Sequence, residues 1–205
     1  MLDRNNLRSY QAHGVDLVKG DKNTALFLDM GLGKTATTLT AINDMLDDFE
    51  VIKALIVCPL RVAQTVWHNE AKDWSHLEGL SFSIITGDLK NRMAALNKKA
   101  DVYVVNRENL SWLIDYYKSK WPFDLLAIDE STSFKNPTSK RFRDLKKVLK
   151  YIKKRIILTG TPAPNGYMDL WSQIYILDEG ERLGKNITRY RNTYFDKDFM
   201  GFNYI

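Results

Sequence analysis

Short, nearly continuous apolar runs alternate with amphipathic stretches along most of this chain. Runs of four to eight apolar residues are typical of buried strands, whereas apolar residues spaced three and four apart indicate a helix with one buried side. The runs predict strands at residues 24–29, 53–58, 82–86, 102–106, 124–129 and 155–159. The amphipathic stretches predict helices at residues 6–19, from 34 to about 48, 62–74, 89–98, 108–119 and 138–150.

The run at 53–58 is apolar at nearly every position, and Pro59 ends it. A strand of this kind is buried on both faces, which is typical of a parallel sheet covered by helices on each side. Regular alternation of strands and helices predicts a doubly wound α/β fold with three layers, α/β/α. No repeat, low-complexity tract or linker divides the units, so residues 1–180 are predicted to form one domain.

The final segment, residues 181–205, has a different character from the rest of the chain. Aromatic side chains stand among charged ones there, and an aromatic end of this kind is expected to pack against another surface. The aromatic residues concerned are Tyr190, Tyr194, Phe195, Phe199, Phe202 and Tyr204.

The composition supports a globular protein that works in a reducing compartment. Of the 205 residues, 44% are hydrophobic and 12% aromatic, which is enough to bury a core. No run approaches the roughly 20 apolar residues of a membrane span, and the first residues lack the apolar segment of a signal peptide. Cys58 is the single cysteine, and the three histidines are scattered, so neither an internal disulfide nor a metal-ligand cluster is expected.

The formal charge of +5 is concentrated in one segment. Residues 140–155 contain nine Lys or Arg and one acid, Asp144, so the rest of the chain has a net charge of −3. A local basic segment fits a nucleic-acid contact, and it equally fits the solvated side of a helix. Both interpretations stay open at this point.

Residues 26–35 combine an apolar strand with a glycine-containing turn and Lys-Thr. Gly31 and Gly33 would let backbone N–H groups point inward at an anion, and the following helix would offer its positive N-terminus. Lys34 would reach the terminal phosphates and the Thr35 hydroxyl would hold Mg²⁺. Leu28 stands where the formal phosphate-binding pattern has its first glycine, so the pattern alone also fits an ordinary glycine-rich turn before a helix.

Polar residues follow the predicted strands, and in an open α/β sheet ligands bind beyond the carboxyl ends of the strands. The pair Asp129-Glu130 closes the strand at 124–129. The aspartate can bind Mg²⁺ beside Thr35, and the glutamate can orient and deprotonate an attacking water. Phosphoryl transfer needs charge neutralisation, a placed metal and a placed water, and these residues supply them.

Five motifs in order now resemble a known family. They are Leu7-Arg-x-Tyr-Gln11, Asp29-Met-Gly-Leu-Gly-Lys-Thr35, Leu55-Ile-Val-Cys-Pro-Leu60, Ile128-Asp-Glu-Ser131, and Leu158-Thr-Gly-Thr-Pro162 with Asn165. Together they resemble the first lobe of superfamily 2 helicases of the Swi/Snf-like DNA translocase type, particularly compact phage or bacterial members. The resemblance implies a RecA-like P-loop domain, with 1–180 as the helicase ATP-binding lobe and 181–205 as a connector towards an absent second RecA-like lobe.

The resemblance also implies roles for individual residues. Gln11 would read adenine, which favours ATP over GTP, and the turn of Gly31, Leu32, Gly33, Lys34 and Thr35 would bind its phosphates. Thr35 and Asp129 would hold Mg²⁺, with Lys34, Asp129 and Glu130 as the catalytic residues. The remaining assignments are Thr159, Gly160 and Thr161 as a motif coupling nucleotide state to the nucleic acid, and Arg61 and Asn106 as DNA-phosphate contacts.

Ser131-Thr132 departs from the family pattern, which has Ala-His or Gly-His there, and this puts in doubt any coupling role that a histidine would have. The leading hypothesis is an ATP-hydrolysing lobe of a DNA-dependent translocase that is weak or inactive without its second lobe. Duplex DNA is the expected partner, and no membrane is expected. The expected location is the cytoplasm of a bacterium or phage-infected cell, or the nucleus of a eukaryote. A non-catalytic DNA- or protein-binding module and an RNA helicase lobe remain as alternatives.

Overall fold

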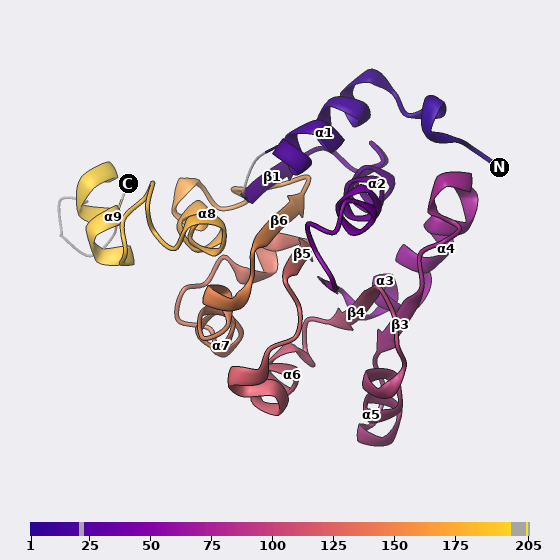
Figure 1. The fold of residues 1–205 in the computed structure, drawn as a ribbon. Coiled ribbons are helices and arrows are strands. Elements are labelled where there is room, and N and C mark those ends of the chain that lie inside the picture. Colours follow the sequence, from indigo (N-terminus) through magenta and orange to yellow (C-terminus); the bar gives the residue numbers. More distant parts are fainter. Residues whose placement is uncertain (21–22, 198–203, 205) are drawn as a thin grey trace.

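The computed structural model describes residues 1–20, 23–197 and Tyr204. Its strands and helices alternate along the chain, as the hydrophobic pattern predicts (Figure 1). The strands are β1 (Asn23–Phe27), β2 (Ala54–Cys58), β3 (Phe82–Ile85), β4 (Val102–Asn106), β5 (Leu125–Asp129) and β6 (Lys154–Thr159). The helices are α1 (Ser9–Gly20), α2 (Lys34–Asp47), α3 (Leu60–Thr65), α4 (Trp67–Asp73), α5 (Leu89–Asn97), α6 (Leu110–Tyr117), α7 (Lys140–Lys146), α8 (Leu170–Asp178) and α9 (Ile187–Tyr194).

The six strands form one parallel sheet in the order β1-β6-β5-β2-β4-β3. The last strand in sequence, β6, therefore lies between β1 and β5. In the register of these three strands, Leu158 pairs with Leu26 on one side and with Asp129 on the other. Because all the strands run the same way, the loops after β1, β5 and β6 meet at one edge of the sheet.

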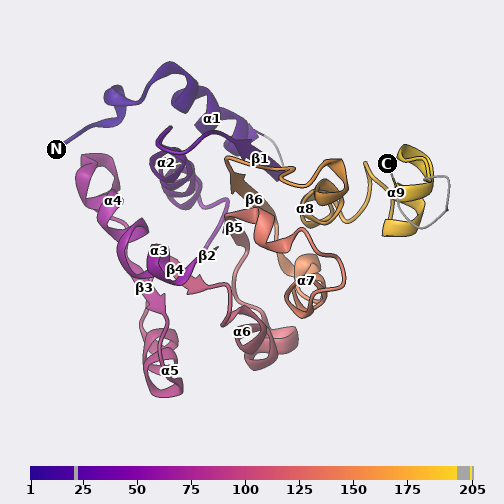
Figure 2. The same ribbon diagram turned by 180° about the vertical axis from the view of Figure 1, so that it is seen from behind.

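Alternate residues of each central strand enter two separate hydrophobic clusters. In β2, Leu55 and Val57 face one cluster, while Ala54, Ile56 and Cys58 face the other. The first cluster is completed by α6, α7 and α8, and the second by α1, α2 and α4, which lie on opposite sides of the sheet in both views (Figures 1 and 2). The predicted three-layer α/β/α arrangement with helices on both faces is confirmed.

The predicted strands are present with ends shifted by one or two residues, but one predicted helix is divided and others are shorter, among them the one predicted at 108–119, which is α6. The helix predicted at 62–74 divides into α3 and α4 at Val66. Thr65 has a side-chain bond to the Arg61 carbonyl, and its own carbonyl accepts from Asn69, so side chains take over part of the helical ladder there. The basic helix predicted at 138–150 ends at Lys146 in α7, and a separate 3₁₀ turn follows at Leu149–Tyr151.

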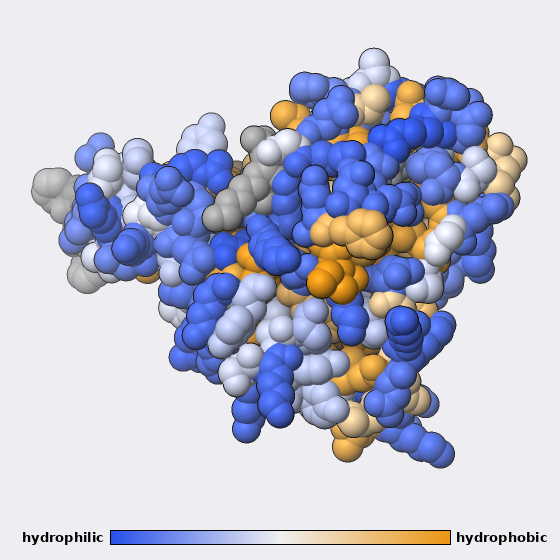
Figure 3. Space-filling view, viewed as in Figure 1, coloured by the Kyte–Doolittle hydropathy of each residue, from blue (hydrophilic) through white to orange (hydrophobic). Residues whose placement is uncertain are grey.

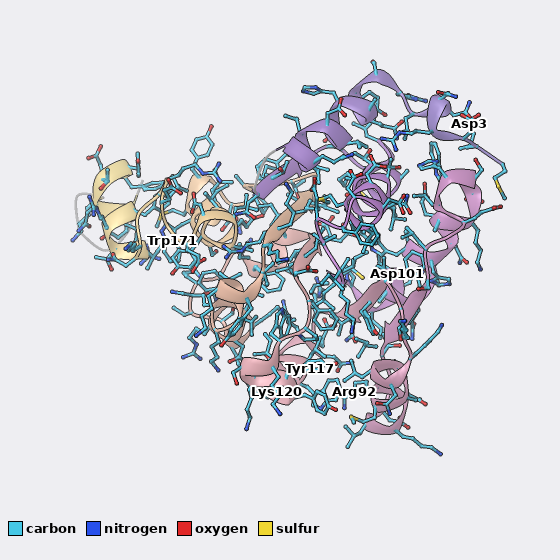
Figure 4. The ribbon with its side chains drawn as sticks, in the orientation of Figure 1. Asp3, Arg92, Asp101, Tyr117, Lys120 and Trp171 are labelled. Atoms are coloured by element: carbon cyan, nitrogen blue, oxygen red, sulfur yellow. The ribbon has the colours of Figure 1, made fainter. Side chains whose placement is uncertain are left out.

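Two helices, α8 and α9, were not predicted from the sequence. Helix α9 belongs to residues 181–197, and contacts with α8 and the turn before it hold this segment on the lobe. Trp171 of α8 donates through its indole nitrogen to the Gly184 carbonyl at 3.0 Å, and Figure 4 shows it at the junction of the two helices. Tyr190 of α9 is buried and donates to the Tyr167 carbonyl at 2.7 Å. Tyr190 and Phe195 therefore pack on the lobe as expected, whereas Phe199 and Phe202 lie outside the described residues.

The surface visible in Figure 3 is mainly hydrophilic, with hydrophobic groups emerging in separate small patches. None of the helices in the described part of the chain is both long and apolar enough to cross a membrane. Among the exposed apolar side chains, Met30 stands out because it belongs to the turn after β1 and is 88% exposed.

Candidate functional site

The turn after β1 has the backbone shape of an anion-binding loop. Gly31 and Gly33 both have left-handed conformations, with φ of 79° and 71°, and α2 begins directly afterwards at Lys34. A β-carbon at Gly33 would lie 2.0 Å from Nε2 of Gln11, so a larger residue there would have to displace this buried side chain as well as adopt a left-handed backbone. Gln11 is buried, and its Oε1 accepts from the Arg8 backbone N–H at 2.8 Å. The structure therefore brings the predicted adenine-reading residue against the phosphate-binding turn.

The ammonium of Lys34 points back across the same turn. It donates to the backbone carbonyls of Leu28 at 2.6 Å and Asp29 at 2.9 Å. These bonds hold a positive charge over the turn, beside the first residues of α2, where Thr35 lies half-buried. A cation, inward-facing amides and a helix N-terminus are the groups that bind polyphosphate.

Asp129, at the carboxyl end of β5, is a half-buried acid whose charge interacts with that of Lys34. Burial raises the pKa of the Asp129 carboxyl to about 6, the charge of Glu130 adds to the rise, and the backbone N–H of Glu130 and the charge of Lys34 oppose it. The N–H of Glu130 donates to Asp129 Oδ1 at 3.0 Å. An ionised carboxylate in such a place has unmet electrostatic demand, which a divalent cation would satisfy.

Trp67, on the first turn of α4, is a core residue that also faces this acid. Its side chain is fully buried, and its indole N–H lacks a hydrogen bond of normal geometry. The N–H is near enough to the carboxyl of Asp129 to lower its pKa, and it also faces Cys58, whose pKa burial raises. The sequence gives no sign of this role of Trp67, because no sequence pattern indicates which way an indole nitrogen points.

Glu130 adopts a left-handed conformation, with φ of 54° and ψ of 58°, which is unusual for a residue with a β-carbon. The conformation turns the chain sharply out of β5 and into a 3₁₀ turn at Ser131–Phe134. Oε2 of Glu130 accepts from the hydroxyls of Thr132 at 3.4 Å and Thr159 at 3.5 Å. The strained backbone thus presents the carboxylate to the loop after β6.

The predicted coupling residues follow β6 and touch both neighbouring turns. Thr159 is fully buried, and its hydroxyl accepts from the Thr161 N–H at 3.1 Å while contacting Glu130. Gly160 lies against the other turn, since a β-carbon there would be 3.4 Å from the Leu28 carbonyl oxygen. Residues 159–161 therefore lie between the phosphate-binding turn and Glu130.

The two residues predicted to contact DNA lie at neighbouring strand ends, but their exposure differs. Arg61 is exposed on the first turn of α3, beyond β2. Asn106, at the end of β4, is 5% exposed, and its amide is bonded to Asn109 at 2.7 Å and to Glu108 at 2.9 Å. Asn106 therefore shapes this loop, and its contact with DNA stays a prediction.

Two arginines that the sequence reasoning missed lie near this loop. Arg107 directly follows Asn106, and its N–H donates to the Cys58 carbonyl at 2.9 Å, which fixes it beside β2. Arg141 of α7 donates to the Ser133 carbonyl at 3.1 Å, and burial together with the charge of Arg107 lowers the pKa of its guanidinium. Only the tertiary fold brings these residues together, because the whole of α6 and β5 lies between them in the sequence.

The basic segment 140–155 does not form a single patch. Arg155 is buried and bonded to Glu179 at 2.7 Å, Lys147 pairs with Asp144 at 2.6 Å, and Lys146 lies over the ring of Tyr175. These side chains serve the packing and solvation of α7, β6 and α8. The interpretation as a structural and solvated segment describes most of it, and Arg141 is the member that turns towards the loops beyond the sheet.

Taken together, the parallel sheet, the phosphate-binding turn and the adjoining acids define a RecA-like P-loop domain. The chain belongs to the SNF2-related domain family, whose model matches residues 10–181. Protein p41 of Acyrthosiphon pisum secondary endosymbiont phage 1 is 41% identical over 197 residues, covering 93% of this chain and 43% of that protein. Helicase swr-1 of Neurospora crassa is 29% identical over 209 residues, covering 93% of this chain and 11% of its own length.

Similarity to solved structures indicates the same family. The Sulfolobus solfataricus SWI2/SNF2 ATPase core in complex with dsDNA has a TM-score of 0.77 and 28% identity, covering 91% of this chain and 38% of that one. The same core domain described without DNA gives a TM-score of 0.68 and 29% identity. The chain spans less than half the length of these relatives.

Proposed function

We propose that this chain is the ATP-binding and hydrolysing lobe of a DNA-dependent translocase and that a second RecA-like lobe completes its active site. The observation that carries the proposal is the meeting of Lys34, Asp129 and Glu130 at one edge of the sheet, on the loops after β1 and β5. A cation for phosphate, an acid for metal and an acid for water are the parts that phosphoryl transfer requires. Relatives that are named as helicases or as an ATPase core support the same activity.

The residues present fit Mg²⁺ and ATP. The turn at Gly31–Thr35 would bind the phosphates, because two left-handed glycines and the start of α2 direct its amides inward. Thr35 and Asp129 would hold Mg²⁺, which supplies charge neutralisation on the phosphates. Lys34 would exchange its two carbonyl partners for phosphate oxygens, and Gln11 would bind the adenine edge.

Glu130 would orient and deprotonate the attacking water. Its carboxylate is fixed by the left-handed backbone and by the hydroxyls of Thr132 and Thr159. A base held in this way leads to hydrolysis when the developing charge on the phosphates is also stabilised. An arginine from a second lobe would supply that stabilisation, and such a group contributes about 10³ to 10⁵ in rate in related enzymes.

DNA is the proposed track for this lobe. Three arginines lie on the loops and helices that follow β2, β4 and β5, namely Arg61, Arg107 and Arg141. Residues 159–161 follow β6 at the same edge of the sheet. Arginine side chains bind phosphate through paired N–H groups and fix a protein on a duplex without reading its sequence. The Sulfolobus relative was solved with double-stranded DNA, which supports duplex over RNA for this chain.

ATP hydrolysis measured with and without nucleic acid tests the proposal. We expect slow hydrolysis by this chain alone and a large stimulation by duplex DNA when a second lobe is joined to it. Lys34→Ala and Glu130→Gln should abolish the stimulated rate. Unchanged function in both variants would favour a non-catalytic binding module, and stimulation by RNA but not by duplex DNA would favour an RNA helicase lobe.

A further inference from the structure

A buried glutamine on α8 connects the catalytic turn after β5 with the loop after β6. The amide of Gln173 is fully buried. Its Oε1 accepts from the Ser131 hydroxyl at 2.7 Å, and its Nε2 donates to the carbonyls of Pro162 at 2.6 Å and Asp169 at 2.9 Å. Ser131 directly follows Glu130, and Pro162 directly follows Thr161. One side chain therefore holds the neighbours of the proposed base and of the coupling residues.

Asp169, one helical turn before Gln173, repeats the same arrangement further from the sheet. Its Oδ2 accepts from Lys135 Nζ at 3.3 Å and from the Asn165 N–H at 3.0 Å. Residues four apart lie on the same side of a helix. The start of α8 therefore has two bridges side by side, each with one end on the turn at 131–135 and the other on the loop at 162–165.

The hydrogen bonds of the Gln173 bridge are shorter than the direct contact between Glu130 and Thr159. Glu130 and Thr159 meet at 3.5 Å, which is the limit of a hydrogen bond, whereas both bonds of the Gln173 bridge are below 2.8 Å. The amide nitrogen donates two hydrogen bonds and the amide oxygen accepts one, and a buried polar group satisfied in this way fixes one geometry. Ser131 and Pro162 are therefore connected through Gln173 by stronger hydrogen bonds than the one that joins Glu130 and Thr159.

We propose that Gln173 is a positioning residue that makes the Glu130 turn and the loop at 162–165 move together, with Asp169 as a second connection. This inference rests on the proposed function. In this chain Ser131 stands where the family pattern has alanine or glycine, and its hydroxyl is one end of the bridge. A change in the turn on nucleotide binding would thus reach exposed residues of the loop, among them Asn165, on the side proposed for DNA.

Steady-state kinetics in a protein that joins this chain to a second lobe test the connection. Gln173→Leu keeps a side chain of similar size without the amide, and Ser131→Ala removes the other end of the bond. We expect each to lower the DNA-stimulated kcat about tenfold, with KM for ATP changed less than twofold. The double variant should be no worse than either single variant, because one bond cannot be lost twice.

Ser172→Ala is the matched control. Ser172 is equally buried on α8, and its hydroxyl donates to the Lys135 carbonyl at 2.6 Å, so it anchors the same turn without touching the loop at 162–165. The control should lower thermal stability and keep the stimulation. Wild-type stimulation in Gln173→Leu, or equal loss of stimulation in Ser172→Ala, would overturn the inference.

A measurement that needs no hydrolysis separates the inference from the proposed function. Hydrogen exchange at the non-proline amides of 160–166 should slow in this chain when Mg²⁺ and a non-hydrolysable ATP analogue are added, and the response should be absent in Gln173→Leu. The same response in both proteins, or none in the wild type, would refute the connection. If the response depends on Gln173 but no nucleic acid stimulates hydrolysis, the connection stands and the proposed translocase function fails.

Discussion

The side-chain amide of Gln11 lies against the α-carbon of Gly33, so the residue proposed to read the base and the turn proposed to bind the phosphates share one contact. Nε2 of Gln11 occupies the space that a β-carbon at position 33 would need, 2.0 Å away. Helix α1 therefore contacts the phosphate-binding turn through Gln11. The contact makes Gly33 more sensitive to substitution than its conformation alone would.

Gly33→Ala should disrupt this turn more than Gly31→Ala does. Both glycines have positive φ, which costs an alanine about 1–2 kcal/mol, but a β-carbon at Gly31 meets nothing within 4 Å. We expect Gly33→Ala to lose more unfolding free energy than Gly31→Ala and to abolish ATP binding. Thermal unfolding and fluorescent-nucleotide titration measure the two effects.

Combining Gly33→Ala with Gln11→Ala should restore part of the lost stability, because it removes the clash and leaves the backbone strain. Equal losses in the two glycine variants, or no recovery in the combined variant, would show that the amide does not confine this turn.

Asp129→Asn should stabilise the nucleotide-free chain at neutral pH. The pKa of Asp129 is raised to about 6 from 3.8, so protonation favours the folded state, and stability is lost as the pH rises through this window. Above pH 6 the ionised, half-buried carboxylate costs at most about 3 kcal/mol, which an amide avoids. Unfolding curves at pH 4 and pH 8 should show a gain only at the higher pH.

The same variant should lose Mg²⁺-dependent ATP hydrolysis, because a neutral amide oxygen is a poorer ligand for this cation than a carboxylate. Asp124→Asn is a useful comparison, since Asp124 precedes the same strand and caps the N–H groups of Ile52 and Lys53 at the opposite edge of the sheet. That variant should lower stability and leave the metal dependence unchanged. A gain for Asp129→Asn that is the same at both pH values would contradict the assigned cause.

Glu130→Gln should separate nucleotide binding from hydrolysis. The amide has nearly the shape of the carboxylate and can keep the contact with Thr159, but it cannot take a proton from water. We expect unchanged affinity for the ATP analogue, a change in unfolding free energy below about 1 kcal/mol, and a loss of about 10² to 10⁴ in hydrolysis. Parallel loss of affinity and rate would instead assign Glu130 to nucleotide binding.

Arg107→Ala and Arg141→Ala should weaken the binding of duplex DNA without changing which sequences are preferred. Each arginine that contacts a phosphate releases about one counterion, so the slope of log affinity against log salt should fall by about one in each variant. Fluorescence anisotropy at several salt concentrations gives this slope. Lys150→Ala removes an equal charge from an exposed position in the 3₁₀ turn before β6 and should leave the slope unchanged. A uniform effect of all three variants would indicate attraction by net charge alone.

The parts of the structure that depend on local sequence could be predicted, and the parts that depend on distant contacts could not. The strands at 102–106 and 124–129 follow from apolar runs, and the phosphate-binding turn follows from Gly33 and Lys34. The order of the strands and the positions of Arg107 and Arg141 are tertiary results. The bridge made by Gln173 was missed because a glutamine within an apolar helix gives no sign of what its amide will bond.

The pairing of β1 with β6 has a consequence for how the protein is made. In the described sheet β1 has β6 as its neighbour, and Asn23 and Arg155 are bonded across 132 residues of sequence. A ribosome adds that length in on the order of 10 s. Throughout this time the strand that carries the phosphate-binding turn has no place in the sheet, and the growing chain must keep its apolar edge from pairing elsewhere. The ability to bind nucleotide would therefore arise late in synthesis, in the step that inserts β6 between β1 and β5.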